Sequence, residues 1–359
     1  MSNYNLKQIR AEAGYALTWS FGTLAIASCA LLAIGAGLGE IWLGAAFALV
    51  APVIALQDTL RITALAMGNA LAAVISDGLW TLLVIVLFVV NALDLWGSTE
   101  SSVLVWGLGG AVGWLVLASA TRVTPTFRRL FEWWSTYWQA RLRFGANYSL
   151  DQVGAVFLTA IATVLVGTAA AAALRGAFTL FGPLAMLITA FMLIFVPQVR
   201  RATGSVADQW RRMLTASAVL SLLGVGTAVV LLAIPDAVGE LILGEVWQPA
   251  MTVVPYVGIS SVAVAWMVST NSMLAAQGMS VSLLRLHVLQ VVLIVLLSAA
   301  GGFIFHTAAG IAAGEAVASW AAAAILLTYV TKVVRRLSDD RAAPSRDRED
   351  DASSRQVLT

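Results

Sequence analysis

The chain has few of the residues on which soluble enzymes rely. Only 11% of its 359 residues are charged, two are histidine, and Cys29 is the single cysteine. A single cysteine excludes an intramolecular disulfide and the usual multi-cysteine metal sites. No GxxxxGK[ST] sequence is present, which excludes the phosphate-binding loop of nucleotide-driven proteins. We therefore expect no metal, no cofactor and no direct use of ATP.

Apolar sequence takes the place of these residues. Hydrophobic residues make up 60% of the chain and the mean hydropathy is +0.88, which predicts an all-α polytopic membrane protein. Pro52, Pro183 and Pro197 are expected to kink or break helices and free carbonyls that are tolerated where they line a cavity. Ten stretches are long enough to span a bilayer, at about 14–36, 42–66, 70–93, 102–120, 148–171, 175–197, 213–234, 252–275, 282–304 and 308–331.

Charged residues predict the orientation of these stretches. Acidic residues occupy the loops that alternate with the basic ones, and Arg175 is the one basic residue on the acidic side. By the positive-inside rule both termini are cytoplasmic, and Trp42, Trp96 and Trp247 fall at the outer interface. The basic loops follow the fourth, sixth and tenth stretches, and they hold Arg122, Arg128, Arg129, Arg141, Arg143, Arg200, Arg201, Arg211, Arg212, Lys332, Arg335 and Arg336.

Charges inside two adjacent stretches mark the first candidate site. A charge at membrane depth costs roughly 2.5–3.5 kcal/mol, so such residues usually face a cavity or a partner. Arg61 lies seven residues before Gly68 and Asp77 nine after it, so a turn at Gly68 places both roughly 10–13 Å from one membrane face. They form either a structural ion pair or part of a transport site. Asp58 and Gln57 lie one turn deeper, and they either bind substrate and ions or satisfy one another.

Further polar residues lie within the later stretches. Asn271 and Arg285 each lie seven residues from Gly278, which places both about 10 Å from the cytoplasmic face. Arg285 either contacts substrate or extends to the headgroups. His287 lies deeper and is either a proton-coupling group or a hydrogen-bonded structural residue.

Two residues nearer the outer face complete the set. Arg175 offers a planar fork of donors that matches a pyrophosphate, or it extends to the outer headgroups. Glu315 lies within the tenth stretch and is expected to point into the bundle. Together with Asp58, Asp77 and His287, Glu315 is a candidate for coupling an ion to transport.

A weak internal repeat indicates two lobes. A shift of 210 residues lays 64–88 on the sequence around 275–297 and aligns Gly68 with Gly278, Asp77 with His287 and Trp80 with Gln290. Gln290 is therefore a further candidate substrate residue. Both copies run from outside to inside, so the lobes are related by an axis along the membrane normal. The first lobe then has four helices and the second six, as if two N-terminal helices were missing.

We expect four regions. Residues 1–122 form an N-terminal lobe, 123–145 a cytoplasmic amphipathic linker, 146–336 a C-terminal lobe, and 337–359 a disordered cytoplasmic tail. The linker is basic and aromatic, and it either joins the lobes along the headgroups or binds anionic lipid for its own sake.

Three segments resemble one family of exporters. They read QDTLRITALAMGNALAAVISDGLW (57–80), ALRGAFTLFGPLAMLITAF (173–191) and LGEVWQPAMTVVPYVG (243–258). They resemble the Wzx-type O-antigen and capsule flippases of the multidrug/oligosaccharidyl-lipid/polysaccharide (MOP) exporter superfamily. The resemblance implies a MATE/MOP-like fold of two pseudo-symmetric lobes in the bacterial cytoplasmic membrane. Members usually have twelve or fourteen helices, so this chain lacks the first two.

The resemblance implies a transporter and not an enzyme. Its substrate is a polyprenyl-pyrophosphate-linked oligosaccharide, which crosses the membrane by alternating access. Arg61, Arg175 and Arg285 would bind the pyrophosphate. Asp58, Asp77, Asn271, Gln277 and Gln290 would meet sugar hydroxyls or a coupling ion, and Gln57 is a further candidate for binding the substrate. Membrane lipids are partners, polysaccharide polymerase and glycosyltransferases are candidate partners, and no nucleic acid is expected.

Other functions stay open. An ion-coupled multidrug or cation antiporter of the same superfamily favours an acidic cavity, whereas here arginine is as prominent as aspartate. A membrane-embedded glycosyltransferase or acyltransferase needs an acid/base cluster at the interface, and the linker has a single acid, Glu132. A nonfunctional exporter fragment is a further alternative.

Overall fold

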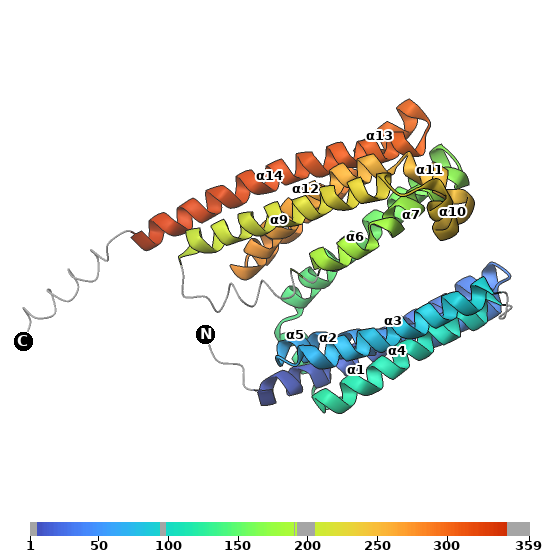
Figure 1. Ribbon diagram of the computed structural model, residues 1–359. Coiled ribbons are helices and arrows are strands. Elements are labelled where there is room, and N and C mark those ends of the chain that lie inside the picture. Colours follow the sequence, from blue (N-terminus) through green and yellow to red (C-terminus); the bar gives the residue numbers. More distant parts are fainter. Residues whose placement is uncertain (1–5, 94–97, 190, 192–204, 343–359) are drawn as a thin grey trace, which may run out of the picture. The chain divides into compact units, whose positions relative to one another are not determined.

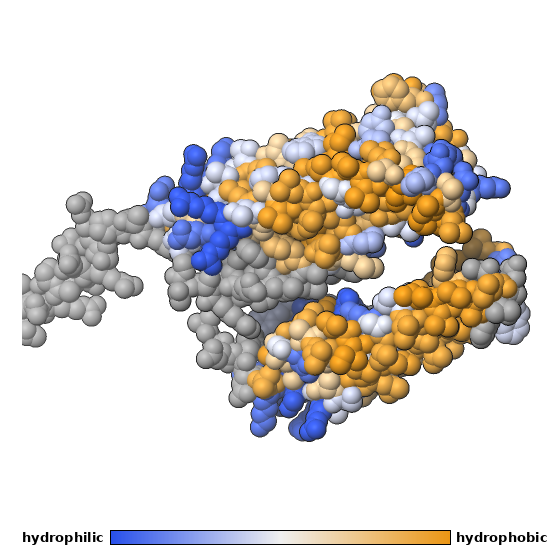
Figure 2. All heavy atoms as spheres, in the orientation of Figure 1, coloured by the Kyte–Doolittle hydropathy of each residue, from blue (hydrophilic) through white to orange (hydrophobic). Residues whose placement is uncertain are grey.

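The computed structural model describes residues 6–93, 98–189, 191 and 205–342 (Figure 1). All regular structure in this part of the chain is helical. Nine helices there are long and apolar enough to cross a membrane, and a bent pair of shorter helices makes a tenth if it counts as one span. In the view of Figure 2, hydrophobic residues cover most of the surface of the long helices. The expectation of an all-helical polytopic membrane protein is confirmed.

The chain forms two compact units, Met1–Trp138 and Gln139–Thr359. In unit 1, α2 packs between α1 and α4, and α4 also packs along α3. Leu60 of α2 and Leu117 of α4 are completely buried in its core. The helices are α1 (Leu6–Gly37), α2 (Ile41–Ala66), α3 (Ala70–Ala92), α4 (Thr99–Thr121) and the short α5 (Leu130–Thr136).

Pro52 lies inside α2 without breaking it. Proline has no N–H, so the carbonyl of Ala48, four residues earlier, loses its helical donor. The hydroxyl of Ser28 on α1 donates to this carbonyl at 2.6 Å. The carbonyl that Pro52 frees is therefore satisfied by a neighbouring helix.

Unit 2 is built around α12, in which 67% of an 18-residue apolar stretch is buried. The helix packs between α9 and α14, and α13 packs along α14. Gly314 of α14 lies so close to α13 that a Cβ atom there would be 2.1 Å from the carbonyl oxygen of Leu297. The helices are α6 (Trp138–Leu165), α7 (Thr168–Leu180), α9 (Val206–Leu232), α10 (Asp236–Leu243), the 3-10 helix η1 (Gly244–Val246), α11 (Trp247–Met251), α12 (Val254–Ala276), α13 (Ser280–Phe305) and α14 (Ala308–Ala342).

The sixth predicted span is broken. Helix α7 ends at Leu180, and the next segment, Gly182–Thr189, is bent by 54° from it. Pro183 disfavours the helical conformation of the residue before it, which explains the break. Pro197 lies outside the described residues.

Two helical hairpins turn through the same backbone motif, one in each unit. Gly68 follows α2 with φ +81° and Gly278 follows α12 with φ +74°. The amides of Asn69 and Met279 donate to carbonyls five residues earlier, and those of the two glycines donate to carbonyls three residues earlier. This is the Schellman motif, in which glycine supplies the left-handed residue. The predicted turns are confirmed, and they recur at the 210-residue spacing of the repeat.

Two predicted boundaries differ from the bounds of the helices. Helix α6 begins at Trp138, so the second half of the segment 123–145 is the start of a long helix. The first half lies against α1, where the amide of Thr126 donates to Thr18 Oγ1 at 2.9 Å. Helix α14 continues to Ala342, so the tail is helical where disorder was expected from residue 337. Residues 343–359 lie outside the described part.

Trp247 is not an interfacial residue as predicted. Its side chain is completely buried, and its indole nitrogen donates to Asp236 Oδ1 at 3.0 Å. Gly239 lies against the ring, where a Cβ atom would lie 1.9 Å from an indole carbon. The tryptophan therefore forms the centre of a small cap made by α10 and α11. Trp42 is 77% exposed, as a lipid-facing belt requires, and Trp96 lies outside the described residues.

Candidate functional site

The polar residues predicted on the first hairpin meet in unit 1. Helix α2 presents Gln57, Asp58 and Arg61, which lie within four residues and so share one side of the helix. Helix α3 begins after Asn69, whose side chain accepts from the amide of Ala72, and presents Asp77 two turns later. The short Schellman turn fixes the register of the two helices and so brings these side chains together.

Arg61 is held between two carboxylates. Its guanidinium forms ion pairs with Asp58 of its own helix and with Asp77 Oδ2, the latter at 3.5 Å. Gln57 donates from Nε2 to Asp77 Oδ1 at 3.0 Å and to Ser76 Oγ at 3.1 Å. The predicted contact between Arg61 and Asp77 is confirmed. Gln57 and Asp58 do not satisfy one another, because each bonds to a different member of the cluster.

The cluster is buried at its base and exposed at its tip. Gln57 is only 2% exposed, whereas the side chains of Asp58, Arg61 and Asp77 are 44%, 36% and 42% exposed. Two carboxylates face one guanidinium, so the cluster carries one net negative charge when all three are ionised. Half-exposed charges at membrane depth must meet water, protein or a polar ligand, because hydrocarbon cannot stabilise them.

Ser76 was not predicted as a site residue. It is completely buried, and it lies under Gly113 of α4, where a Cβ atom would be 2.7 Å from the serine oxygen. A single serine in an apolar helix has no distinctive signal, since such residues usually bond to their own helix. Its position next to Asp77 is the only indication that the sequence offers.

The candidate polar residues of unit 2 differ in their hydrogen bonds. The buried Asn271 Oδ1 and Gln290 Oε1 have no hydrogen-bond partner among the described residues. His287 is 3% exposed, and its Nδ1 donates to Asn147 Oδ1 of α6 at 2.8 Å. The histidine therefore joins two helices, which agrees with its structural interpretation.

Arg175 and Arg285 differ from Arg61 in having no carboxylate. Both are exposed on unit 2, and neither forms an ion pair within the described residues. Their guanidinium groups are therefore free to bind an anion or to extend to headgroups.

Glu315 points into unit 2, as expected. Its side chain lies on α14, the residue is 8% exposed, and its Oε2 atom has no hydrogen-bond partner in the described part of the chain.

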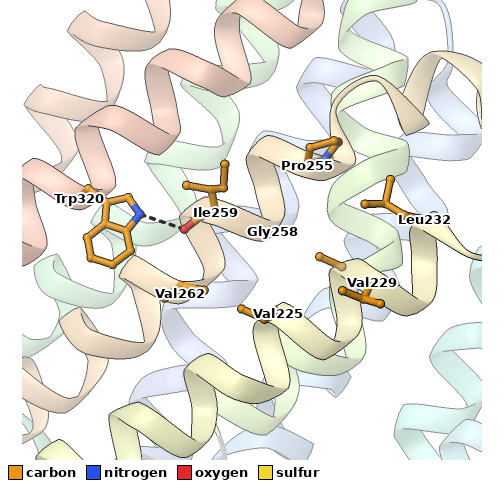
Figure 3. A pocket seen from close by; sticks show the side chains of 9 residues that line it. Val225, Val229, Leu232, Pro255, Gly258, Ile259, Val262 and Trp320 are labelled. Carbon is orange, nitrogen blue, oxygen red and sulfur yellow. Dashed lines mark hydrogen bonds between the residues drawn. The ribbon is translucent and has the colours of Figure 1, made fainter.

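A groove on unit 2 has a different chemistry. It has a volume of about 350 Å³ and is lined by α9 and α12, with Trp320 of α14 at one end (Figure 3). Its lining is aliphatic except for the Trp320 indole, whose nitrogen donates to the Ile259 carbonyl at 3.2 Å. No hydrogen-bonding group is left for a sugar, so this groove cannot be the polar site.

Comparison with solved structures identifies the architecture. A structure described as MATE in complex with MaL6 superposes with a TM-score of 0.73 at 15% identity, over 93% of this chain and 82% of that one. An outward-facing multidrug resistance MATE family transporter of the MOP superfamily gives 0.71 at 15% identity, over 92% and 81%. The inward-facing form gives 0.67 at 16% identity, over 93% and 83%. The fold is that of a MATE transporter.

The MATE fold agrees with the predicted class of architecture. No protein-family model and no curated protein sequence matches the chain. At such low identity the MATE fold does not distinguish between substrates. The narrower resemblance to Wzx-type flippases therefore stays a prediction.

Proposed function

We propose that the protein is a membrane transporter that works by alternating access and carries a polyprenyl-pyrophosphate-linked oligosaccharide. The observation that carries the proposal is the half-exposed ionic cluster at membrane depth on a unit of MATE fold. An ion pair of this kind is weak evidence for a purely stabilising role, because the desolvation of the charges opposes their attraction. Solved structures of this fold bear the descriptions outward-facing and inward-facing, which supports alternating access.

The hydrogen-bonding inventory supports a sugar as cargo. The exposed carboxylates of Asp58 and Asp77 accept from hydroxyls, and Arg61 donates to them. The unpartnered amide oxygens of Asn271 and Gln290 are further acceptors once unit 2 opens. Gln57 is buried beneath the cluster and holds Asp77 in place.

The arginines take different parts in this proposal. Arg61 is already paired with two carboxylates, so it orients the cluster and binds anions weakly. Arg175 and Arg285 have no carboxylate partner in the described residues and are better suited to the pyrophosphate. Asp58, Asp77, His287 and Glu315 are the candidates for the coupling ion.

A cation antiporter is the second candidate. The net negative charge of the unit 1 cluster favours it, as does the description of two solved structures as multidrug resistance transporters. No such observation favours a glycosyltransferase or an acyltransferase.

Deletion of the gene and complementation with variants test the proposal. Loss of the protein is expected to strand lipid-linked oligosaccharide on the cytoplasmic leaflet and to reduce surface glycan. Arg61→Gln removes the positive charge that pairs with both carboxylates of the cluster, so we expect transport to fall roughly tenfold, which corresponds to about 1.4 kcal/mol. Arg336→Gln, an exposed arginine of α14, is the matched control and is expected to transport normally.

The same strains separate the alternatives. Normal surface glycan with altered dye efflux would favour the cation antiporter and overturn the proposed cargo. Sugar transfer catalysed by the purified protein would favour the enzyme.

A further inference from the structure

The segment that follows α4 is fastened to one end of unit 1. The amide of Thr126 donates to Thr18 Oγ1 at 2.9 Å and to the Gly14 carbonyl at 3.1 Å. Gly14 allows this close approach, because a Cβ atom there would lie 2.6 Å from the Thr124 carbonyl oxygen. The backbone that leads into α5 therefore lies directly on α1.

Aromatic stacking fastens α5 itself to α1. Trp133 stacks on Tyr15, with ring centroids 5.5 Å apart. Trp134 stacks on Trp19, with ring centroids 4.1 Å apart. The indole nitrogen of Trp133 also donates to Glu12 Oε2 at 2.6 Å. Because aromatic pairs contribute to stability beyond the area that they bury, α5 has a fixed place at one end of the unit 1 bundle (Figure 1).

The length of α1 places α5 at a membrane interface. Helix α1 ends at Gly37, and Tyr15 and Trp19 lie 22 and 18 residues before that end. At the rise of an α-helix these separations are about 33 and 27 Å. The hydrocarbon core of a bilayer is about 30 Å thick, so α5 lies at headgroup level when Gly37 lies at the opposite interface. By the predicted orientation, the interface beside α5 is the cytoplasmic one.

At this level the segment exposes aromatic and basic side chains together. Phe127 and Phe131 are 73% and 79% exposed. Three arginines of the segment are exposed as well. Arg122 and Arg128 form no ion pair with a described residue. The α5 patch is the set of these five residues, Arg122, Phe127, Arg128, Arg129 and Phe131.

The charge at this end of unit 1 favours an anionic partner. Its charged residues are five basic and two acidic ones, Lys7, Arg10, Arg122, Arg128 and Arg129 against Glu12 and Glu132. Both acids are already engaged, Glu12 by the Trp133 indole and Glu132 by Arg129 at 3.6 Å. The planar fork of a guanidinium group matches phosphate oxygens, and basic clusters next to a membrane span bind anionic lipids.

The exposed phenyl rings favour a lipid over a soluble anion. A soluble phosphate would pair with the arginines and leave Phe127 and Phe131 in water. A phospholipid supplies the phosphate and covers both rings, because apolar side chains at this level enter the boundary between headgroups and acyl chains.

We propose that the α5 patch is a binding site for anionic phospholipid at the cytoplasmic interface. The three arginines bind the headgroup phosphate and select its charge, and Phe127 and Phe131 set the depth of α5 in the interface. Because α5 is stacked on α1, the lipid is bound by unit 1 itself and not by a free linker. The site does not depend on the cargo of the proposed function.

Quenching by spin-labelled lipids tests the proposal. The full chain carries Cys29→Ala and Ser135→Cys, an exposed position of α5 outside the patch. A fluorophore is attached to the new cysteine, and the protein is reconstituted in phosphatidylcholine vesicles. Nitroxide-labelled phosphatidylglycerol or phosphatidylcholine is then added in equal small amounts. We expect the phosphatidylglycerol to quench more strongly, and this preference to weaken as the salt concentration rises.

Arginine variants test the selection of charge. Arg122→Gln, Arg128→Gln and Arg129→Gln together are expected to abolish the preference, because each arginine near an anionic surface raises the affinity about fivefold. The matched control removes the same charge from exposed positions of unit 2 and is expected to keep the preference; it combines Arg211→Gln, Arg212→Gln and Arg336→Gln.

Phenylalanine variants test the depth of α5. Phe127→Ser combined with Phe131→Ser is expected to reduce quenching by both lipids equally and to keep the preference for phosphatidylglycerol. Both rings are exposed, so their loss leaves the stacking of α5 on α1 intact.

Four results would overturn the proposal. Equal quenching by the two lipids would show that the patch does not select charge. No quenching by either lipid would show that α5 meets water or another protein instead. Loss of the preference in the unit 2 control as well would show that net charge, and not the patch, selects the lipid. Unchanged quenching in the phenylalanine variant would show that the rings do not enter the interface.

Discussion

Individual polar side chains inside the apolar bundle form hydrogen bonds with groups on neighbouring helices. Ser28 satisfies the carbonyl freed by Pro52, and Gln57 satisfies both Ser76 and Asp77. Each bond joins two helices, so each fixes their register as well as satisfying a polar group. A buried donor or acceptor without its partner costs more than the bond contributes when it is formed.

Gln57→Leu tests this at the base of the cluster. The substitution keeps the apolar packing and removes both donated bonds, which leaves Ser76 and one oxygen of Asp77 without their donor. We expect the free energy of unfolding to fall by about 1–3 kcal/mol, measured by chemical denaturation in detergent. Gln152→Leu, at an exposed position of α6, is the matched control. Equal stability of the two variants would show that Gln57 does not support the cluster.

At the level of the helices, turns and caps fix where each helix begins and ends more closely than the apolar stretches do. The two Schellman turns place the same motif at equivalent points of both units. The α10–α11 cap forms around one tryptophan because a glycine leaves room for the ring. Each of these features depends on a single glycine. Replacing that glycine with alanine would hardly change the composition of the segment around it.

Gly68→Ala and Gly278→Ala are expected to destabilise the protein similarly. Each places a Cβ in a left-handed conformation at a cost of roughly 1–2 kcal/mol. Nothing lies within 4 Å of either added Cβ, so the cost comes from the backbone alone. Thermal unfolding of both variants is compared with that of Gly22→Ala, a helical position with equal space. A neutral effect at either turn would contradict the left-handed conformation there.

Gly239→Ala is expected to displace Trp247. The added Cβ would overlap the indole ring, and overpacking of this kind costs about 1–3 kcal/mol or more. A red-shifted tryptophan emission and a lower Tm are the expected signs. Gly226→Ala, at an exposed position of α9 with open space, is expected to be neutral or slightly stabilising. Unchanged emission in Gly239→Ala would contradict the packing of the cap.

At the scale of the whole molecule, the charge pattern predicts one orientation for every loop. Basic loops are predicted to be cytoplasmic, and the acidic loops with Glu40 and Glu240 to be external. Each unit then carries candidate polar residues of its own, the ionic cluster in unit 1 and Arg175, Asn271, Arg285 and Gln290 in unit 2.

Cysteine labelling checks the orientation in a Cys29→Ala background. Glu40→Cys and Glu240→Cys are expected to react with a membrane-impermeant maleimide in intact cells. Arg122→Cys and Arg212→Cys are expected to react only after the membrane is permeabilised. All four positions are exposed, so access to the reagent depends on the side of the membrane alone. The opposite pattern would reverse the predicted topology.

The sequence alone determined the class of fold and the contact between Arg61 and Asp77, and its ten predicted spans compare with nine spanning helices and one bent pair in the described residues. Spans and turns can be recognised from short segments of the sequence, because a bilayer sets the length of a span and a glycine marks a tight turn. The helical period then places the charged residues at one depth. The candidate residues of unit 1 could therefore be named before the structure was known.

Only the tertiary structure decided which residues these side chains bond to or pack against. It joined Gln57 to Asp77, assigned Arg61 to two carboxylates, buried Trp247 in a cap and left the Oε2 atom of Glu315 without a hydrogen-bond partner among the described residues. These outcomes depend on rotations of helices about their axes and on contacts between residues far apart in the chain. A membrane helix is apolar on every side, so its sequence carries almost no signal for which face meets a neighbour.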